Sequence, residues 1–210
     1  MTAASPPALP DERLATGAAR PATRHKGRFA PETVHGVLAD SYRPLADTAR
    51  IPTHLTVLAE RFAAERLDAL AHVNGAPGAG LPRVLFVGSP NAGRSPLAAT
   101  LLQHRAAGRV TVSSAGTQPV GEVEPYIEQV LAETGADVTG ALPKPLTDEV
   151  VQAADIVITM GCGDACPVLP GRRSLDWPVA GPDGAPVTAI RQIRDDNDAG
   201  TTDPLATPPA

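Results

Sequence analysis

The stretch RVLFVGSPNAGRS, residues 83–95, decides the fold of this chain. Its first part, Val84 to Val87, is a short apolar run typical of a buried strand. Small residues and two glycines follow, and helical spacing of apolar residues begins after Pro96, a residue favoured in the first turn of a helix. A strand, a tight loop and a helix N-terminus direct several backbone N–H groups to one point, which favours an anion there. Arg94 can add a guanidinium that binds an oxyanion through two hydrogen bonds.

This loop resembles the active-site loop of the low-molecular-weight protein tyrosine phosphatases and the related thiol-dependent arsenate reductases. That family's motif is a cysteine, five residues, an arginine, and then a serine or threonine. Arg94 and Ser95 match its last two positions, so the position of the nucleophile is held by Gly88. The resemblance implies that an arsenate or phosphate oxyanion binds in the loop. The anion-binding residues that it implies are Ser89, Asn91, Ala92, Gly93, Arg94 and Ser95.

Segments after the loop resemble the same family. Residues 114–117 (Ser-Ala-Gly-Thr) match a segment that follows its second strand, and residues 142–151 are close to the arsenate reductase branch. Residues 160–167, Met-Gly-Cys-Gly-Asp-Ala-Cys-Pro, are nearly the signature of that branch. The resemblance therefore implies an arsenate reductase relative rather than a tyrosine phosphatase.

The two groups that perform the family's chemistry are both replaced by glycine. The attacking thiolate would stand at Gly88, and no cysteine lies between this residue and Ser95. The family's proton-donating aspartate precedes a proline shortly after a tryptophan, and alignment on residues 175–182 puts Gly181 at its position. We therefore expect a catalytically inactive relative, or pseudoenzyme, that keeps oxyanion binding for sensing or partner interaction. No cofactor is expected.

The alternative is an active arsenate reductase or phosphatase. It would use Cys162 and Cys166, or an external thiol bound where Gly88 leaves room. In thioredoxin-coupled members of the family, two such cysteines relay the oxidising equivalent outward as a disulfide. The resemblance thus implies thioredoxin or a small thiol as a partner. Three interpretations of the cysteine pair stay open: a relic, a redox-sensitive disulfide, or a site for a thiophilic ion such as trivalent arsenic.

The pattern of strands and helices predicts an α/β fold. β-Branched or apolar runs at residues 109–114 and 156–160 follow the first strand, residues 172–175 lead into a fourth strand, and helical segments separate them. Such alternation is typical of a parallel sheet with right-handed crossovers. The resemblance implies the four-stranded, flavodoxin-like order of the phosphotyrosine phosphatase family.

The rest of the chain divides by composition. We predict a disordered tail at residues 1–28, a helical module at 29–73, a linker at 74–82, the phosphatase-like domain at 83–195 and a second disordered tail at 196–210. Pro44 is expected to kink or end the first helix of the module. The module resembles a small helical domain that precedes the reductase-like domain in some actinobacterial proteins. It could bind a second copy of the chain or another protein, because two short helices bury little by themselves.

Composition excludes several classes of function. The net charge of −5 disfavours nucleic-acid binding, and no apolar run approaches the ~20 residues of a membrane span. An apolar signal core is missing at the N-terminus, which favours the cytoplasm. Two cysteines are too few for a disulfide scaffold. The histidines His35, His54 and His72 show no metal-ligand spacing, so no metal site is expected.

Overall fold

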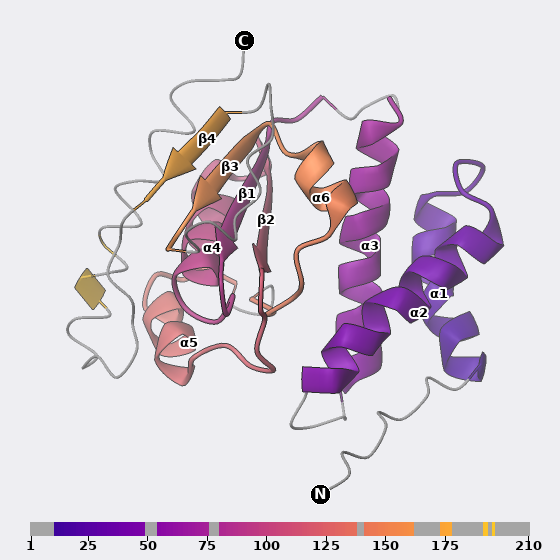
Figure 1. Cartoon of the computed structure of the whole chain (residues 1–210), viewed down its shortest axis with the longest axis horizontal. Helices are drawn as coiled ribbons and strands as arrows, with labels where there is room; N and C mark the ends of the chain where they lie inside the picture. The colour runs from indigo at the N-terminus through magenta and orange to yellow at the C-terminus, as the bar shows by residue number, and fades with distance from the viewer. Residues whose placement is uncertain are drawn as a thin grey trace, which may run out of the picture. The chain divides into compact units, whose positions relative to one another are not determined.

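The computed structural model of the chain describes residues 11–48, 54–75, 80–137, 141–161, 173–177, 191, 192 and 195 (Figure 1). The chain divides into two compact units, residues 1–76 and residues 77–210. The first is helical, and the second contains the sheet. In the described part of the chain, no helix is both long enough and apolar enough to cross a membrane.

The N-terminal unit consists of three helices, α1 (Asp11–Arg24), α2 (Pro31–Thr48) and α3 (Leu55–Val73). Apolar side chains at helical spacing on α2 and α3 are buried against each other, as the sequence pattern predicts. The largest of them are Leu38, Phe62 and Leu67, all with at most 1% of their surface exposed. An ion pair of 2.8 Å between Arg66 and Asp40 joins the two helices at their edge. Burial of apolar surface between the helices is therefore the main force that holds this unit together.

Helix α1 contradicts the prediction of disorder up to residue 28. Residues 11–24 are helical, and the buried positions Gly17, Ala18, Pro21 and His25 recur at helical spacing. A side chain at Gly17 would come within 2.8 Å of the Glu60 carboxylate on α3, so the two helices approach closely. The prediction failed because the buried positions carry mostly small residues in a segment that is polar overall and contains Pro21, so its helical periodicity was not recognised.

Helix α2 also corrects an expectation, because it continues past Pro44 to Thr48. The proline lacks the N–H that would bond the carbonyl of residue 40, one turn earlier, so the helix loses one backbone hydrogen bond at this point. Buried Tyr42 and Leu45 flank the proline on the packed side of the helix. Tertiary packing thus outweighs the local cost of the proline.

The second unit contains a four-stranded parallel sheet in the order β2-β1-β3-β4. Its strands are β2 (Thr111–Gly116), β1 (Arg83–Gly88), β3 (Ile156–Thr159) and β4 (Arg173–Asp176). This order confirms the predicted α/β, flavodoxin-like fold. Gly88 pairs with Gly116, and Val87 pairs with Thr159, so the carboxyl ends of three strands meet beside the loop that follows β1.

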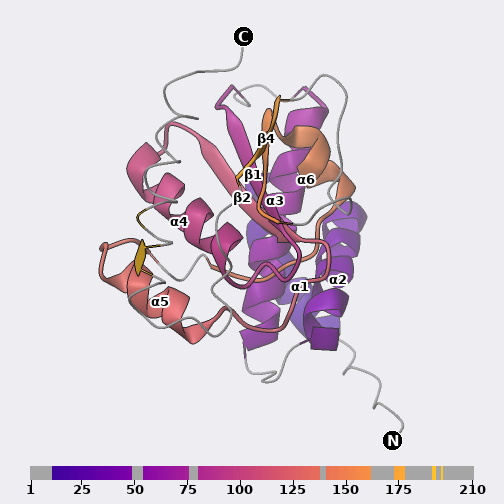
Figure 2. The same cartoon turned by 60° about the vertical axis from the view of Figure 1, so that its left-hand side comes forward.

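Helices cover both faces of this sheet. Figure 2 shows α4 (Arg94–Ala106) and α5 (Pro125–Ala132) on one face and α6 (Asp148–Ala153) on the other. Phe86 and Ile158 of the sheet pack with Leu102 of α4 in one buried cluster, and Trp177 meets the Phe86 ring edge-on at 5.6 Å. A second cluster joins α4 to α5. Both ends of the loop that follows β1 are therefore anchored, one in a central strand and the other in a buried helix.

Candidate anion-binding site

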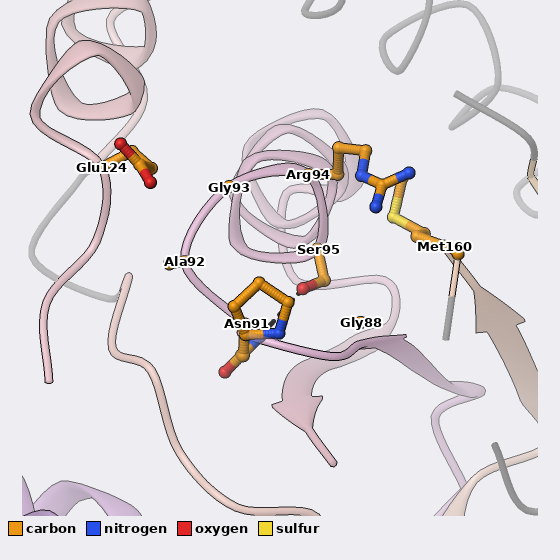
Figure 3. Close-up of a pocket in the computed structure, with 10 residues that line it drawn as sticks. Gly88, Asn91, Ala92, Gly93, Arg94, Ser95, Glu124 and Met160 are labelled. Carbon is orange, nitrogen blue, oxygen red and sulfur yellow. Dashed lines mark hydrogen bonds between the residues drawn. The ribbon is translucent and has the colours of Figure 1, made fainter. Parts of the chain in front are cut away.

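A pocket of about 250 Å³ lies at the carboxyl ends of β1 and β3, where the loop between β1 and α4 curves around it (Figure 3). Ligands of open α/β sheets bind beyond the carboxyl ends of the strands, and this pocket has that position. The loop of residues 88–95 supplies most of its lining. The lining residues are Gly88, Pro90, Asn91, Ala92, Gly93, Arg94, Ser95, Glu124, Met160 and Gly161.

The segment of residues 117–124 holds the loop by its carbonyl groups. Backbone N–H groups of Thr117, Gln118, Val120 and Glu124 donate to the carbonyls of residues 88, 89, 90 and 92 at 2.9 to 3.3 Å. Because a trans peptide has its N–H opposite its C=O, the amides of residues 91 and 93 point away from this segment. Within the described part of the chain, the N–H groups of residues 91–93 donate to no other group. They are donors available for an anion.

Asn91 fixes the curvature of the loop. Its φ is 50°, in the left-handed region that asparagine tolerates better than most residues. The side chain is fully buried; its Oδ1 accepts from the Lys144 amide, and its Nδ2 donates to Ser95 Oγ, both at 3.0 Å. One side chain therefore ties the loop both to the start of α4 and to the neighbouring segment at residue 144.

Gly116, at the end of β2, makes room for the loop. A Cβ atom at this position would stand 2.7 Å from the Ser89 carbonyl oxygen and 2.8 Å from the Asn91 Cβ. The Gly116 amide donates to the Lys144 carbonyl, and the Gly116 carbonyl accepts from the Leu146 amide. The match of residues 114–117 to the family thus has a steric reason, since only glycine fits between the strand and the loop.

Arg94 lies at the start of α4 with its guanidinium over Gly161. The ideal Cβ position of Gly161 is 2.9 Å and 3.0 Å from the two terminal nitrogens of Arg94. Gly161 has a φ of +76° and follows Met160, whose side chain points toward the guanidinium in Figure 3. Figure 3 also shows Glu124 on the opposite side of the loop from Arg94. The pocket therefore has a positive side, formed by the guanidinium and the helix N-terminus, and a negative side.

Gly88, which the sequence analysis predicts at the family's cysteine position, is buried and lines the pocket. An ideal Cβ there would stand 3.0 Å from Ser95 Oγ and 3.9 Å from the Met160 carbonyl oxygen. A side chain at residue 88 would therefore start beside the Ser95 hydroxyl. In Figure 3 this hydroxyl lies between Asn91 and Gly88. The pocket floor is therefore open at Gly88 and polar at Ser95.

Most of the residues predicted for the site lie together. Asn91, Ala92, Gly93, Arg94 and Ser95 line the pocket with Gly88. Ser89 is not part of the lining, and its carbonyl accepts from the Gln118 amide at 2.9 Å. The remaining candidates Cys162, Cys166 and Gly181 lie outside the described residues. The role of the loop in anion binding stays a prediction.

Sequence reasoning missed Glu124, Gly161 and the role of Met160 in the lining. A signal existed for the last two, because they directly follow β3 and the carboxyl ends of parallel strands share one edge. For Glu124 there was none, since it reaches the pocket through the segment after β2. Among the described residues, no three histidine, cysteine, aspartate or glutamate side chains are grouped to hold a metal ion.

The fold and the loop define the class of phosphatase-like proteins whose anion loop joins the first strand to a helix. Comparison with family models agrees with this class in both units. Residues 14–71 match the protein-tyrosine-phosphatase-like N-terminal domain, and residues 83–171 match the low molecular weight phosphotyrosine protein phosphatase family.

Individual relatives are arsenate reductases. The structure of a Corynebacterium glutamicum thioredoxin-dependent arsenate reductase is 42% identical, with a TM-score of 0.83; the match covers 94% of this chain and 97% of that one. The glutaredoxin arsenate reductase of Synechocystis sp. is 28% identical over 54% of this chain and 88% of its own length. A solved arsenate reductase in its phosphate-binding state is 26% identical, with a TM-score of 0.54, over 60% of this chain and 98% of that one.

This chain belongs to the arsenate reductase and low-molecular-weight phosphatase family. The predicted resemblance is confirmed for the α/β domain and for the N-terminal helical domain that precedes it.

Proposed function

We propose that this chain is a catalytically inactive member of its family that binds an arsenate or phosphate oxyanion in the loop of residues 88–95. One observation supports the proposal: the N–H groups of residues 91–93 have no described partner and Arg94 lines the same pocket, while glycine is the lining residue at position 88, where the resemblance implies the reacting thiol. Inward amides and a guanidinium stabilise an oxyanion without any chemical step. Binding of this kind suits sensing, or the recruitment of a protein partner in an arsenic response.

No other described group near the pocket is suited to replace the thiol. Ser89 does not line the pocket, and a hydroxyl near its ordinary pKa is a weak nucleophile. Ser95 lines the pocket, but its only described contact is the amide nitrogen of Asn91, which cannot accept its proton. If the nucleophile must come from the described residues, neither serine can serve and the chain is inactive.

The relatives support arsenate or phosphate as the ligand. One solved arsenate reductase, 26% identical, is in a phosphate-binding state. Two further relatives are named as a thioredoxin-dependent arsenate reductase and a glutaredoxin arsenate reductase. Arsenate and phosphate are both tetrahedral anions with four oxygens, so the same ring of donors can bind either.

Turnover and binding should be measured on the same samples. The reduced full chain is incubated with arsenate, thioredoxin and its reductase, and arsenite is quantified, with the Corynebacterium glutamicum enzyme as the active comparator. We expect no arsenite above background from this chain, and saturable arsenate binding in calorimetry. Arsenite formation at a rate comparable to that of the comparator would overturn the inactive assignment.

A second candidate function, an active reductase, is favoured by the position of Gly161. This residue lines the pocket against Arg94, and Cys162 follows it directly, one Cα–Cα step of about 3.8 Å away. If arsenite does form, Cys162→Ser and Cys166→Ser variants test this candidate. Loss of turnover in both would support it, and undiminished turnover would exclude it in favour of an external thiol.

A further inference from the structure

We propose that one oxygen of the bound oxyanion occupies the space beside Gly88 and accepts a hydrogen bond from the Ser95 hydroxyl. The inference rests on the proposed function and deepens it, because it turns the vacant position of the nucleophile into part of the binding site. The ligand class is a small tetrahedral oxyanion such as arsenate or phosphate.

The direction of the hydrogen bonds around Asn91 leads to this assignment. The Lys144 backbone amide can only donate, so the atom of Asn91 that faces it at 3.0 Å must be the carbonyl oxygen Oδ1. The other atom of the same amide, Nδ2, therefore faces Ser95 Oγ at 3.0 Å. Nδ2 can only donate, so Ser95 Oγ is the acceptor in this pair.

The proton of the Ser95 hydroxyl consequently needs another acceptor. Ser95 is buried, with 2% of its surface exposed, and no acceptor for this proton lies among the described residues. The hydroxyl lines the pocket on the side of Gly88. A buried donor without a partner is costly, and an anion oxygen in the pocket satisfies it.

Distances place the acceptor beside Gly88. A hydroxyl donor and an oxygen acceptor lie 2.5–3.0 Å apart, and the ideal Cβ position of Gly88 is 3.0 Å from Ser95 Oγ. An anion oxygen bound to Ser95 and a side chain at residue 88 would therefore compete for the same space. A thiolate there would also repel the anion, whereas glycine leaves the donor to the ligand.

Two substitutions test the assignment by calorimetric titration of the full chain with inorganic phosphate and with arsenate. Ser95→Ala removes the donor, and Gly88→Ala fills the space but keeps the Ser95 hydroxyl. Each should raise the dissociation constant about tenfold, as expected for a hydrogen bond to a charged group. The matched controls Ser114→Ala, a buried serine outside the lining, and Gly80→Ala, where a Cβ meets nothing within 4 Å, should stay within about twofold of wild type.

The amide resonance of Lys144 shows whether the loop keeps its shape, because this N–H bonds Asn91. A tenfold loss in Gly88→Ala with an unmoved Lys144 resonance supports the inference. Unchanged affinity in both Gly88→Ala and Ser95→Ala, while Arg94→Ala loses binding, overturns it and leaves the proposed function intact. Absence of saturable binding in the wild type overturns both.

Discussion

The loop of residues 88–95 and the N-terminal helical unit are held in shape by different forces. The helical unit rests on apolar faces, where side chains such as Leu38 and Phe62 are buried between helices. The loop rests on backbone hydrogen bonds from residues 117–124, on one asparagine, and on glycines with no room for a side chain. Apolar packing can adjust to small changes, whereas hydrogen-bonded backbone in close contact cannot. The proposed anion site therefore lies where the geometry is most tightly determined.

The largest expected difference between the two regions comes from one type of substitution, glycine to alanine. Gly116→Ala would drive a methyl group to 2.7 Å from the Ser89 carbonyl, and we expect it to destabilise the α/β unit by about 1–3 kcal/mol and to abolish anion binding. Gly36→Ala, in α2 with nothing within 4 Å, should instead stabilise its helix by about 0.5–1 kcal/mol. Urea unfolding of both variants measures the effect. An equal change in unfolding stability for the two variants would show that the two regions do not differ in their tolerance of a side chain.

The substitution Gly161→Ala tests whether anion binding depends on the position of the Arg94 guanidinium. Alanine in the left-handed backbone conformation of residue 161 costs about 1–2 kcal/mol of stability. Its methyl group would also lie 2.9 Å from the Arg94 guanidinium, so phosphate affinity should fall about tenfold. Gly135→Ala is the matched control, since its φ is +73° but nothing lies within 4 Å. Calorimetry should find that only the first variant loses affinity. A similar loss in both would mean that general destabilisation is responsible.

The helical unit, unlike the loop, should respond to mild acid through His25. Burial lowers the pKa of His25 below its ordinary value of 6.5, although the nearby Asp68 carboxylate partly opposes this. The unfolded chain then binds the proton more readily, so stability is full above about pH 6.5 and falls as the pH decreases below it. Urea midpoints at about pH 7.5 and about pH 5.5 measure the loss. His25→Gln should reduce this pH dependence, and the exposed-site control His35→Gln should not.

The smallest expected effect concerns the negative side of the pocket. Glu124 lines the pocket, so its carboxylate repels a bound anion through partly solvated space. We expect Glu124→Gln to tighten phosphate binding about two- to threefold, with Glu128→Gln on exposed α5 surface as the control. Weaker binding in Glu124→Gln would indicate that the carboxylate accepts a hydrogen bond from a protonated oxygen of the anion.

The strand, loop and helix of residues 83–106 could be predicted from the sequence because their signals are local. An apolar run, two glycines and a first-turn proline specify strand, turn and helix without reference to distant residues. The assignment of Gly88 to the position of the nucleophile rests on counting within one motif of the resembling family and stays a prediction. The confirmed sheet order followed from the resemblance to the family.

Other features could not be predicted because they depend on contacts between distant residues. Helix α1 is stabilised by the close approach of small residues such as Gly17 to α3, and the sequence does not show that these small residues are buried. Glu124 reaches the pocket only because its N–H bonds the Ala92 carbonyl. The hydroxyl proton of Ser95 lacks an acceptor because of the orientation of the Asn91 side chain. This orientation is determined by the hydrogen bond from Lys144, which is 53 residues away in the sequence.

The most direct test of an anion site without its nucleophile is a calorimetric titration with arsenate of the reduced full chain and of Arg94→Ala. The account predicts saturable binding to one site in the wild type. In the variant, loss of a charge-assisted hydrogen bond should weaken binding by about 10- to 100-fold. Equal affinity in the two proteins, or no saturable heat in the wild type, would contradict the claim that this loop still binds an oxyanion.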